Sequence, residues 1–285
     1  MKKPPRMFAV LPTLLTLGNA ACGFGSITVA AKVGPEPLED INSLLLLSIA
    51  ASLIFLAMLF DLLDGSAARW AKQTSDFGAQ LDSLCDAISF GVAPAFLMLQ
   101  FVLYEYADGE SSSLAIAFHP RLLWVIAVLF VVCTVLRLAR FNVETDEDNS
   151  HDYFSGLPSP AAAGTVASIP IAAGLNHLVA PSIATTSSEI SAWLIPILKV
   201  SLPVVTLLVA CLMVSRVHYS HVFNQLFRGK RNRQHVIQLV FTFAVVFVVH
   251  EMVLPLIFCY FSFWAPLKSL CREVVGRRLH KSQHI

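Results

Sequence analysis

Long apolar stretches separated by short polar segments dominate the hydropathy pattern of this chain. Each stretch is roughly 16–25 residues long, close to the ~20 residues that a helix needs to cross a bilayer. They cover residues 8–32, 41–63, 80–104, 121–139, 158–179, 192–214, 234–250 and 252–268. The pattern predicts an all-α fold, a polytopic bundle of transmembrane helices.

The basic residues are distributed unevenly among the connecting segments. If there are eight crossings and both termini share one side, then all of the 20 Lys and Arg residues except Lys32, Arg121 and Lys199 lie on that side. Because cytoplasmic loops are enriched in Lys and Arg, we expect both termini in the cytoplasm and the protein in the inner (cytoplasmic) membrane. Residues 234–268 are short for two helices, and one long helix broken at Pro255 would give seven spans. That alternative places the basic tail outside, so we favour eight.

Composition agrees with a membrane protein. Hydrophobic residues make up 56% of the chain, charged residues 14%, and the mean hydropathy is +0.68. The net charge of +1 gives no indication of a nucleic-acid partner. No repeat or long linker divides the chain, so residues 1–285 are predicted to form a single integral membrane domain.

Four aspartates stand at the ends of the second and third apolar stretches. Asp61 and Asp64 are three residues apart and Asp82 and Asp86 are four apart, so each pair shares one face of its helix. An unpaired carboxylate at a membrane boundary costs on the order of several kcal/mol, so four without matching lysines predict a bound cation. Oxygen ligands favour Mg²⁺ or Mn²⁺ over zinc, and four carboxylates are enough for two ions.

Small residues and one arginine accompany these carboxylates. Gly65, Ala68 and Gly78 leave room for a large ligand against the backbone, and Arg69 offers a cation for bidentate contact with a phosphate. A simpler interpretation has the aspartates capping helices or facing water. A third is the ion pathway of a cation-coupled transporter, in which intramembrane acids are common. The cluster, however, lies near one surface, and the chain lacks a matched pair of interrupted helices.

The string D-x2-D-G-x2-A-R-x8-G-x3-D-x3-D runs from Asp61 to Asp86. It resembles, without departure, the signature of the CDP-alcohol phosphatidyltransferases. The resemblance implies an integral membrane enzyme, usually a homodimer, with six core helices around a polar cavity. It also implies the reaction, in which the hydroxyl of an alcohol attacks the diphosphate of a CDP-linked lipid and CMP leaves.

The same resemblance implies roles for individual residues. Asp61, Asp64 and Asp82 correspond to ligands of one metal ion, and Asp61, Asp82 and Asp86 to ligands of a second. Asp86 also corresponds to the proposed general base of the family. The residues expected to contact the CDP-lipid are Asn19, Gly65, Ala68, Arg69, Ser75 and Gly78.

Three further segments resemble the phosphatidylserine synthase branch of the family. They are LPTLLTLGNAACGFG at 11–25, LRLARFNV at 136–143 and FSGLPSPAAA at 154–163. This likeness implies CDP-diacylglycerol as the donor and L-serine as the acceptor. It covers a core of residues 8–222, after which residues 223–285 would supply a basic loop, two C-terminal helices and a tail.

The acceptor is indicated less directly than the metal site. Arg137 and Arg140 are either cytoplasmic anchors or cavity residues that bind a carboxylate or a phosphate, and Asn142 is a candidate for the serine amino or hydroxyl group. Glycerol-3-phosphate or inositol phosphate remains an alternative acceptor for the same chemistry. A phosphorylated acceptor would require more arginines around the cavity than these two.

Overall fold

Helices make up almost all of the chain that the structure describes. The computed structural model describes residues 7–33, 43–71, 76–103, 119–146, 154–179, 187–215, 218–219, 254–264 and 266. Its helices are α1 (Met7–Ala30), α2 (Ser43–Ala71), α3 (Asp76–Asp86), the π-helix η1 (Ala87–Val92), α4 (Ala93–Leu103), α5 (Pro120–Asp146), α6 (Ser159–Val179) and α7 (Ser187–Val214). Since α3, η1 and α4 follow one another without a break, they form one continuous rod.

Five helical segments within the described residues are long and apolar enough to cross a membrane. They are Pro12–Ala30, Ser43–Gly65, Phe77–Leu103, Pro120–Val143 and Pro196–Val214. They coincide with five of the predicted stretches, and α6 coincides with the stretch at 158–179. The prediction of an all-α bundle with several membrane spans is thereby confirmed.

The two C-terminal stretches are described only in part. Residues 234–250 lie outside the described residues, and the stretch at 252–268 contains a shorter apolar helix, Leu254–Trp264. Phe258 of this helix packs edge-on against Phe55 of α2, with ring centroids 5.5 Å apart. The hydroxyls of Ser262 and Thr165 lie 2.8 Å apart, which joins the helix to α6. The choice between seven and eight spans stays a prediction.

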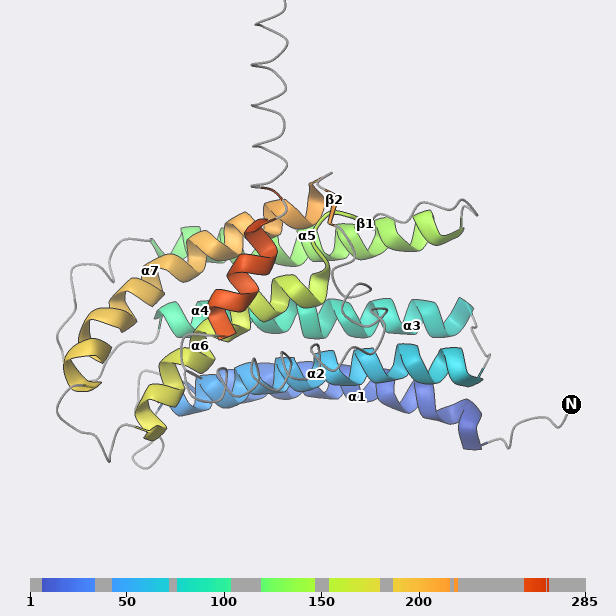
Figure 1. Ribbon diagram of the computed structural model, residues 1–285, viewed down its shortest axis with the longest axis horizontal. Coiled ribbons are helices and arrows are strands. Elements are labelled where there is room, and N and C mark those ends of the chain that lie inside the picture. The colour runs from blue at the N-terminus through green and yellow to red at the C-terminus, as the bar shows by residue number, and fades with distance from the viewer. Residues whose placement is uncertain are drawn as a thin grey trace, which may run out of the picture.

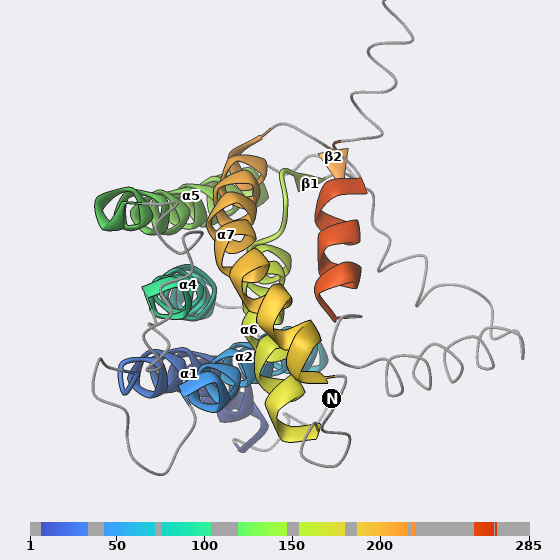
Figure 2. The same ribbon diagram turned by 90° about the vertical axis from the view of Figure 1, so that its left-hand side faces the viewer.

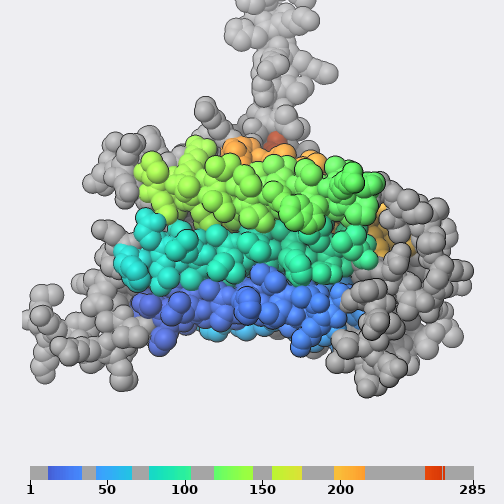
Figure 3. Space-filling model, turned by 180° about the vertical axis from the view of Figure 1, so that it is seen from behind, coloured from blue at the N-terminus to red at the C-terminus, as the bar shows by residue number. Residues whose placement is uncertain are grey.

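The core helices lie in two orientations. Helices α1, α2, α5 and the α3–η1–α4 rod run side by side, and α6 and α7 cross them obliquely (Figure 1; end-on in Figure 2). Helix α2 packs against α1 and, less extensively, against α6, and α5 packs mainly against α7. Seen from behind, α1, the α3–α4 rod and α5 form three parallel ridges (Figure 3). The rod therefore lies between α1 and α5, and side chains of both helices can contact the end of it that carries Asp82 and Asp86.

Small side chains and hydroxyls hold α2 and α6 together. Ala162, Ala163 and Ala167 of α6 are fully buried. From α2, the Oγ of Ser48 donates to the carbonyl oxygens of Leu44 and Pro170, at 2.9 and 3.0 Å. Small residues and interhelical hydroxyl bonds are the usual means of close packing inside a membrane, where lipid is as apolar as the protein core.

A short antiparallel pair of strands lies where α6 begins. Strand β1 (Phe154–Ser155) pairs antiparallel with β2 (His218–Tyr219). The next residue, Gly156, has φ +88°, and a β-carbon there would press on backbone oxygens at the end of α7. Only glycine fits this combination without strain. The Leu157 amide then donates to the Leu212 carbonyl at 3.1 Å, which ties the start of α6 to the end of α7.

Candidate functional site

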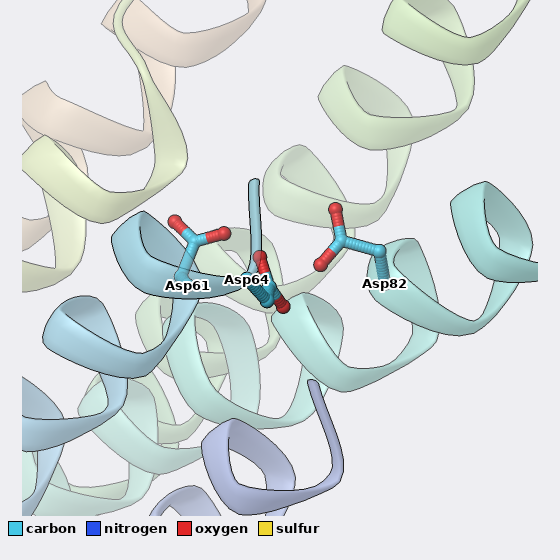
Figure 4. A group of neighbouring side chains, drawn as sticks. All are labelled: Asp61, Asp64 and Asp82. Carbon is cyan, nitrogen blue, oxygen red and sulfur yellow. The ribbon is translucent and has the colours of Figure 1, made fainter. Parts of the chain in front are cut away.

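Three aspartates from two helices converge at one end of the bundle. Asp61 and Asp64 lie on α2 and Asp82 lies on α3, and each offers a carboxylate oxygen within 4.8 Å of the others. Their carboxylates point toward one another across the gap between the two helices (Figure 4). Asp64 is 5% exposed, and Asp61 and Asp82 are half-buried. Three of the four aspartates singled out from the sequence therefore lie together in the structure.

Two buried oxygens of this cluster lack the protein partners that a buried charge requires. Among the described residues, Asp64 Oδ2 and Asp82 Oδ1 are buried and accept no hydrogen bond. Asp61 is repelled electrostatically by both Asp82 and Asp64. An ionised carboxylate is an acceptor only, so these oxygens need a cation or a donor from outside the protein. Clustered carboxylate oxygens near one end of the bundle fit a hard divalent cation.

Asp86 lies one turn further along α3 and has a different environment. It is 7% exposed and is not one of the three aspartates whose oxygens lie within 4.8 Å of one another. Its Oδ1 accepts a hydrogen bond of 2.9 Å from Nδ2 of Asn19 on α1. The charges of Asp61, Asp82 and Asp64 all act on it. Asp86 therefore borders the acidic cluster and is anchored separately from it.

Arg137 brings a positive charge to this site from α5. Its side chain is half-buried and interacts electrostatically with Asp86 and Asp61. It donates from Nη1 to the hydroxyl of Ser159, the first residue of α6, and it lies 5.9 Å from the ring centroid of Phe141. Arg140, one turn further along α5, is exposed. The structure thus separates the two arginine candidates, because Arg137 faces the acidic cluster.

Asn142 and Ser83 connect α5 to the acidic helix. Asn142 Nδ2 lies 2.9 Å from Ser83 Oγ, and Ser83 Oγ lies 3.1 Å from Asn142 Oδ1. Ser83 follows Asp82 directly, so Asn142 stands beside the cluster. The predicted acceptor residues Arg137 and Asn142 are therefore both close to the aspartates.

The residues expected to contact the CDP-lipid are described unequally. Gly65 has open space where a side chain would be, with no atom within 4 Å of a β-carbon built there. Gly78 is half-buried on α3. Ala68 and Arg69 continue α2, but their side chains fall outside the described part of the chain, and Ser75 lies outside the described residues.

Sequence reasoning missed three polar residues at this site. Thr16 of α1 is buried and lies within hydrogen-bonding reach of Asp64. Ser83 and Ser159 contact Asn142 and Arg137, as described above. The available signal was polarity inside an apolar stretch: Thr16 precedes Asn19 by three residues, which places both on one face of α1.

Comparison with known proteins identifies the protein family. The family model for CDP-alcohol phosphatidyltransferase matches residues 9–200. The chain belongs to this family. Members of the CDP-alcohol phosphatidyltransferase family generally use a divalent metal ion, which agrees with the carboxylate cluster of Asp61, Asp64 and Asp82. The prediction of the family from the sequence is confirmed.

Several relatives of known name resemble part of the chain. A CDP-diacylglycerol–serine O-phosphatidyltransferase of Mycobacterium bovis is 33% identical over 158 residues, 54% of this chain and 46% of the relative. One of the same name from Methanocaldococcus jannaschii is 43% identical over 112 residues, 39% of this chain and 45% of the relative. An archaetidylserine synthase of Methanothermobacter thermautotrophicus is 36% identical over 164 residues, 56% of this chain and 58% of the relative. The matches span about half the length of these relatives.

Proposed function

We propose that this protein transfers a phosphatidyl group from CDP-diacylglycerol to the hydroxyl of L-serine and releases CMP. The observation that carries the proposal is the convergence of Asp61, Asp64 and Asp82, with unpartnered carboxylate oxygens, in a member of this family. The names of the relatives support serine as the acceptor. Membership of the family also disfavours a cation-coupled transporter.

The acidic residues would hold Mg²⁺ or Mn²⁺, and we propose two ions. Asp61, Asp64 and Asp82 would bind the first, and Asp61 and Asp82 would share the second with Asp86. When bound, the ions stabilise negative charge on the diphosphate and on the departing CMP. Gly65, whose α-carbon faces open space, would allow the nucleotide to approach the backbone of α2. The remaining CDP-lipid contacts that the family resemblance implies are Asn19, Ala68, Arg69, Ser75 and Gly78.

Asp86 would act as the general base. Its carboxylate would take the proton of the serine hydroxyl while the hydroxyl oxygen attacks the phosphorus that carries the diacylglycerol. The bond from that phosphorus to the bridging oxygen breaks, and CMP leaves with the electron pair. The products are phosphatidylserine, CMP and a protonated Asp86. Burial of Asp86 beside Asn19 supports this role, because the carboxylate is held in one orientation.

Arg137 would recognise the carboxylate of serine. Its guanidinium interacts electrostatically with Asp86 and Asp61, which supports binding of an acceptor close to Asp86. Asn142, which is joined to Ser83, would contact the amino group, and Arg140 is a weaker candidate because it is exposed. Glycerol-3-phosphate or inositol phosphate remains the alternative acceptor for this site.

The aspartates lie at the end of the bundle that we propose faces the cytoplasm. The same end holds the start of α1, the start of α3 and the end of α5, which carries Arg137 and Arg140 (Figure 1). The bias of basic residues toward this side supports an active site at the inner face of the cytoplasmic membrane, with both termini cytoplasmic. We also propose that the protein works as a homodimer, as is usual in the family.

The proposal is tested by CMP release from CDP-diacylglycerol by the purified protein. We expect release only when serine and Mg²⁺ or Mn²⁺ are both present, with phosphatidylserine identified by mass spectrometry. Parallel reactions should contain glycerol-3-phosphate or inositol phosphate in place of serine. Release with one of these and none with serine would make that compound the acceptor. No release with any acceptor would overturn the proposal.

Arg137→Gln is expected to raise the KM for serine about 10- to 100-fold, because a hydrogen bond between charged groups contributes about 1.5–3 kcal/mol. The KM for CDP-diacylglycerol should change less than about threefold, since the nucleotide lipid is assigned to α2 and α3. Steady-state kinetics in detergent would measure both constants. Arg121→Gln, at the opposite end of α5, is the control and should leave both unchanged. An unaltered serine KM in Arg137→Gln would remove this residue from the acceptor site.

A further inference from the structure

A hydrogen bond between two transmembrane helices fixes Asp86. Asn19 of α1 is fully buried, and its Nδ2 donates to Asp86 Oδ1 at 2.9 Å. This bond occupies Oδ1 and holds the carboxylate in one orientation, with Oδ2 outside the bond.

Asn19 is itself held by the π-helix that follows Asp86. The Oγ of Ser89, in η1, donates to the backbone carbonyl of Asn19 at 2.9 Å. π-Helical turns are rare, and they occur frequently at functional sites. This one begins at the residue directly after Asp86, so the carboxylate and the hydroxyl that secures its partner belong to one rigid segment. The result is a closed loop of contacts from Asp86 to Asn19 to Ser89 and back along the chain.

Gly23 allows α1 and η1 to come close enough for these bonds. It lies one turn after Asn19, and a β-carbon built on it would be 2.7 Å from the α-carbon of Ser89. Real β-carbons do not approach a backbone atom so closely, so any larger residue would force the helices apart. On its other side η1 packs against α5, where a β-carbon on Gly91 would meet Thr134 at 3.3 Å. Because η1 is packed on both sides, a larger residue at Gly23 would displace α1 rather than the π-helix.

We propose that Asn19 is a positioning residue for Asp86, and that Gly23 and Ser89 keep it in reach. This inference rests on the proposed role of Asp86 as the base. It assigns Asn19 a task different from the CDP-lipid contact that the family resemblance implies. A positioning residue affects turnover, whereas a nucleotide contact affects the KM for CDP-diacylglycerol, so the two assignments make different predictions.

Gly23→Ala is expected to lower kcat for CMP release about 10- to 100-fold, because a displacement of about 1 Å at a reacting group can cost about 10²-fold. The KM values for serine and CDP-diacylglycerol should stay within about threefold of those of the parent protein. The matched control is Gly25→Ala on the same helix, where the new β-carbon would meet only Leu53 Cδ1 at 3.4 Å. Its kcat should remain within about twofold, because that contact is an ordinary one.

A double-mutant cycle tests whether Gly23 acts through Asn19. Asn19→Ala should lower kcat to a similar extent, and adding Gly23→Ala to it should then lower kcat less than about twofold further. A purely structural role for Gly23 would give independent effects that multiply, and that result would overturn the proposal. A rise in the KM for CDP-diacylglycerol at unchanged kcat in Asn19→Ala would also overturn it, by making Asn19 a nucleotide contact.

Ser89→Ala keeps the test decisive if Gly23→Ala fails to fold. It removes one hydroxyl and adds no atom, so we expect kcat to fall about 3- to 10-fold, as for a single hydrogen bond, and to fall little in the Asn19→Ala background. Unchanged kcat in Ser89→Ala would contradict the proposal that the Ser89 hydrogen bond keeps Asn19 in place. A parent protein that releases no CMP would defeat the proposed function instead, whereas an active parent with unaffected variants would defeat only the positioning role.

Discussion

Asp82→Asn is expected to lower CMP release by about 10²- to 10³-fold, the usual effect of removing a group that stabilises charge in the transition state. Asp82 is the α3 member of the three-carboxylate cluster and faces Asp61 and Asp64 of α2 (Figure 4). Asparagine has the same shape but one charge less, so a divalent ion should bind weakly. Turnover at increasing Mn²⁺ or Mg²⁺ would measure the loss.

The same variant should respond to the ion differently from the parent protein. Two unit charges about 4 Å apart repel by about 4 kcal/mol at an effective dielectric constant of about 20, so neutralising one should raise the melting temperature in a chelator. Added Mn²⁺ should stabilise the parent protein strongly and Asp82→Asn weakly, because an ion that binds only the folded state adds stability. Gln80→Ala, an exposed site on the same helix, is the control. Equal stabilisation of Asp82→Asn and the parent by Mn²⁺ would contradict a metal role for Asp82.

The convergence of the aspartates could be predicted because it depends on local geometry. Asp61 and Asp64 lie near the end of α2, and Asp82 lies near the start of the rod that follows a short connection, so these two regions must be neighbours. Spacings of three and four residues then place each pair of carboxylates on one face of its helix. The membrane-spanning helices could be predicted for a similar reason, since length and hydropathy suffice to identify them.

The rotation of each helix about its axis could not be predicted. In a membrane protein the lipid-facing and core-facing sides are both apolar, so hydropathy does not distinguish exposed Leu62 from buried Leu97. For that reason the sequence left Arg137 and Arg140 equivalent, whereas the structure turns Arg137 toward the acidic cluster. The Asn142 contact with Ser83 depends on the same rotation.

The π-helix is a second feature that lacks a signal in the sequence. Residues 87–92 read as ordinary apolar helix, and the widened turn packs against both α1 and α5. Its consequence is chemical, because it places Ser89 against Asn19 and thereby fixes the amide that holds Asp86. Asn19 was expected from the family resemblance as a CDP-lipid contact, and its contact with Asp86 emerged only in three dimensions.

Asp86→Asn is expected to reduce turnover about 10²- to 10⁴-fold, the range that general base catalysis contributes, because an amide cannot accept the serine proton. The change is isosteric, and the new side chain can still present an oxygen to Asn19 Nδ2. The fold and the binding of CDP-diacylglycerol should therefore survive, with a dissociation constant within about threefold of the parent value. Single-turnover CMP release and direct lipid-binding measurements would separate the two quantities.

Comparison with Asp82→Asn then separates the base role of Asp86 from binding of the first ion by Asp61, Asp64 and Asp82. Asp86 lies outside the group of three aspartates within 4.8 Å of one another, so Asp86→Asn should keep most of the stabilisation by Mn²⁺ that Asp82→Asn loses. Complete loss of that stabilisation would make Asp86 a principal ligand of the first ion, and the loss of turnover would then no longer identify it as the base. Turnover retained within about tenfold would remove Asp86 as the base, because the proton of the serine hydroxyl would then have a different acceptor.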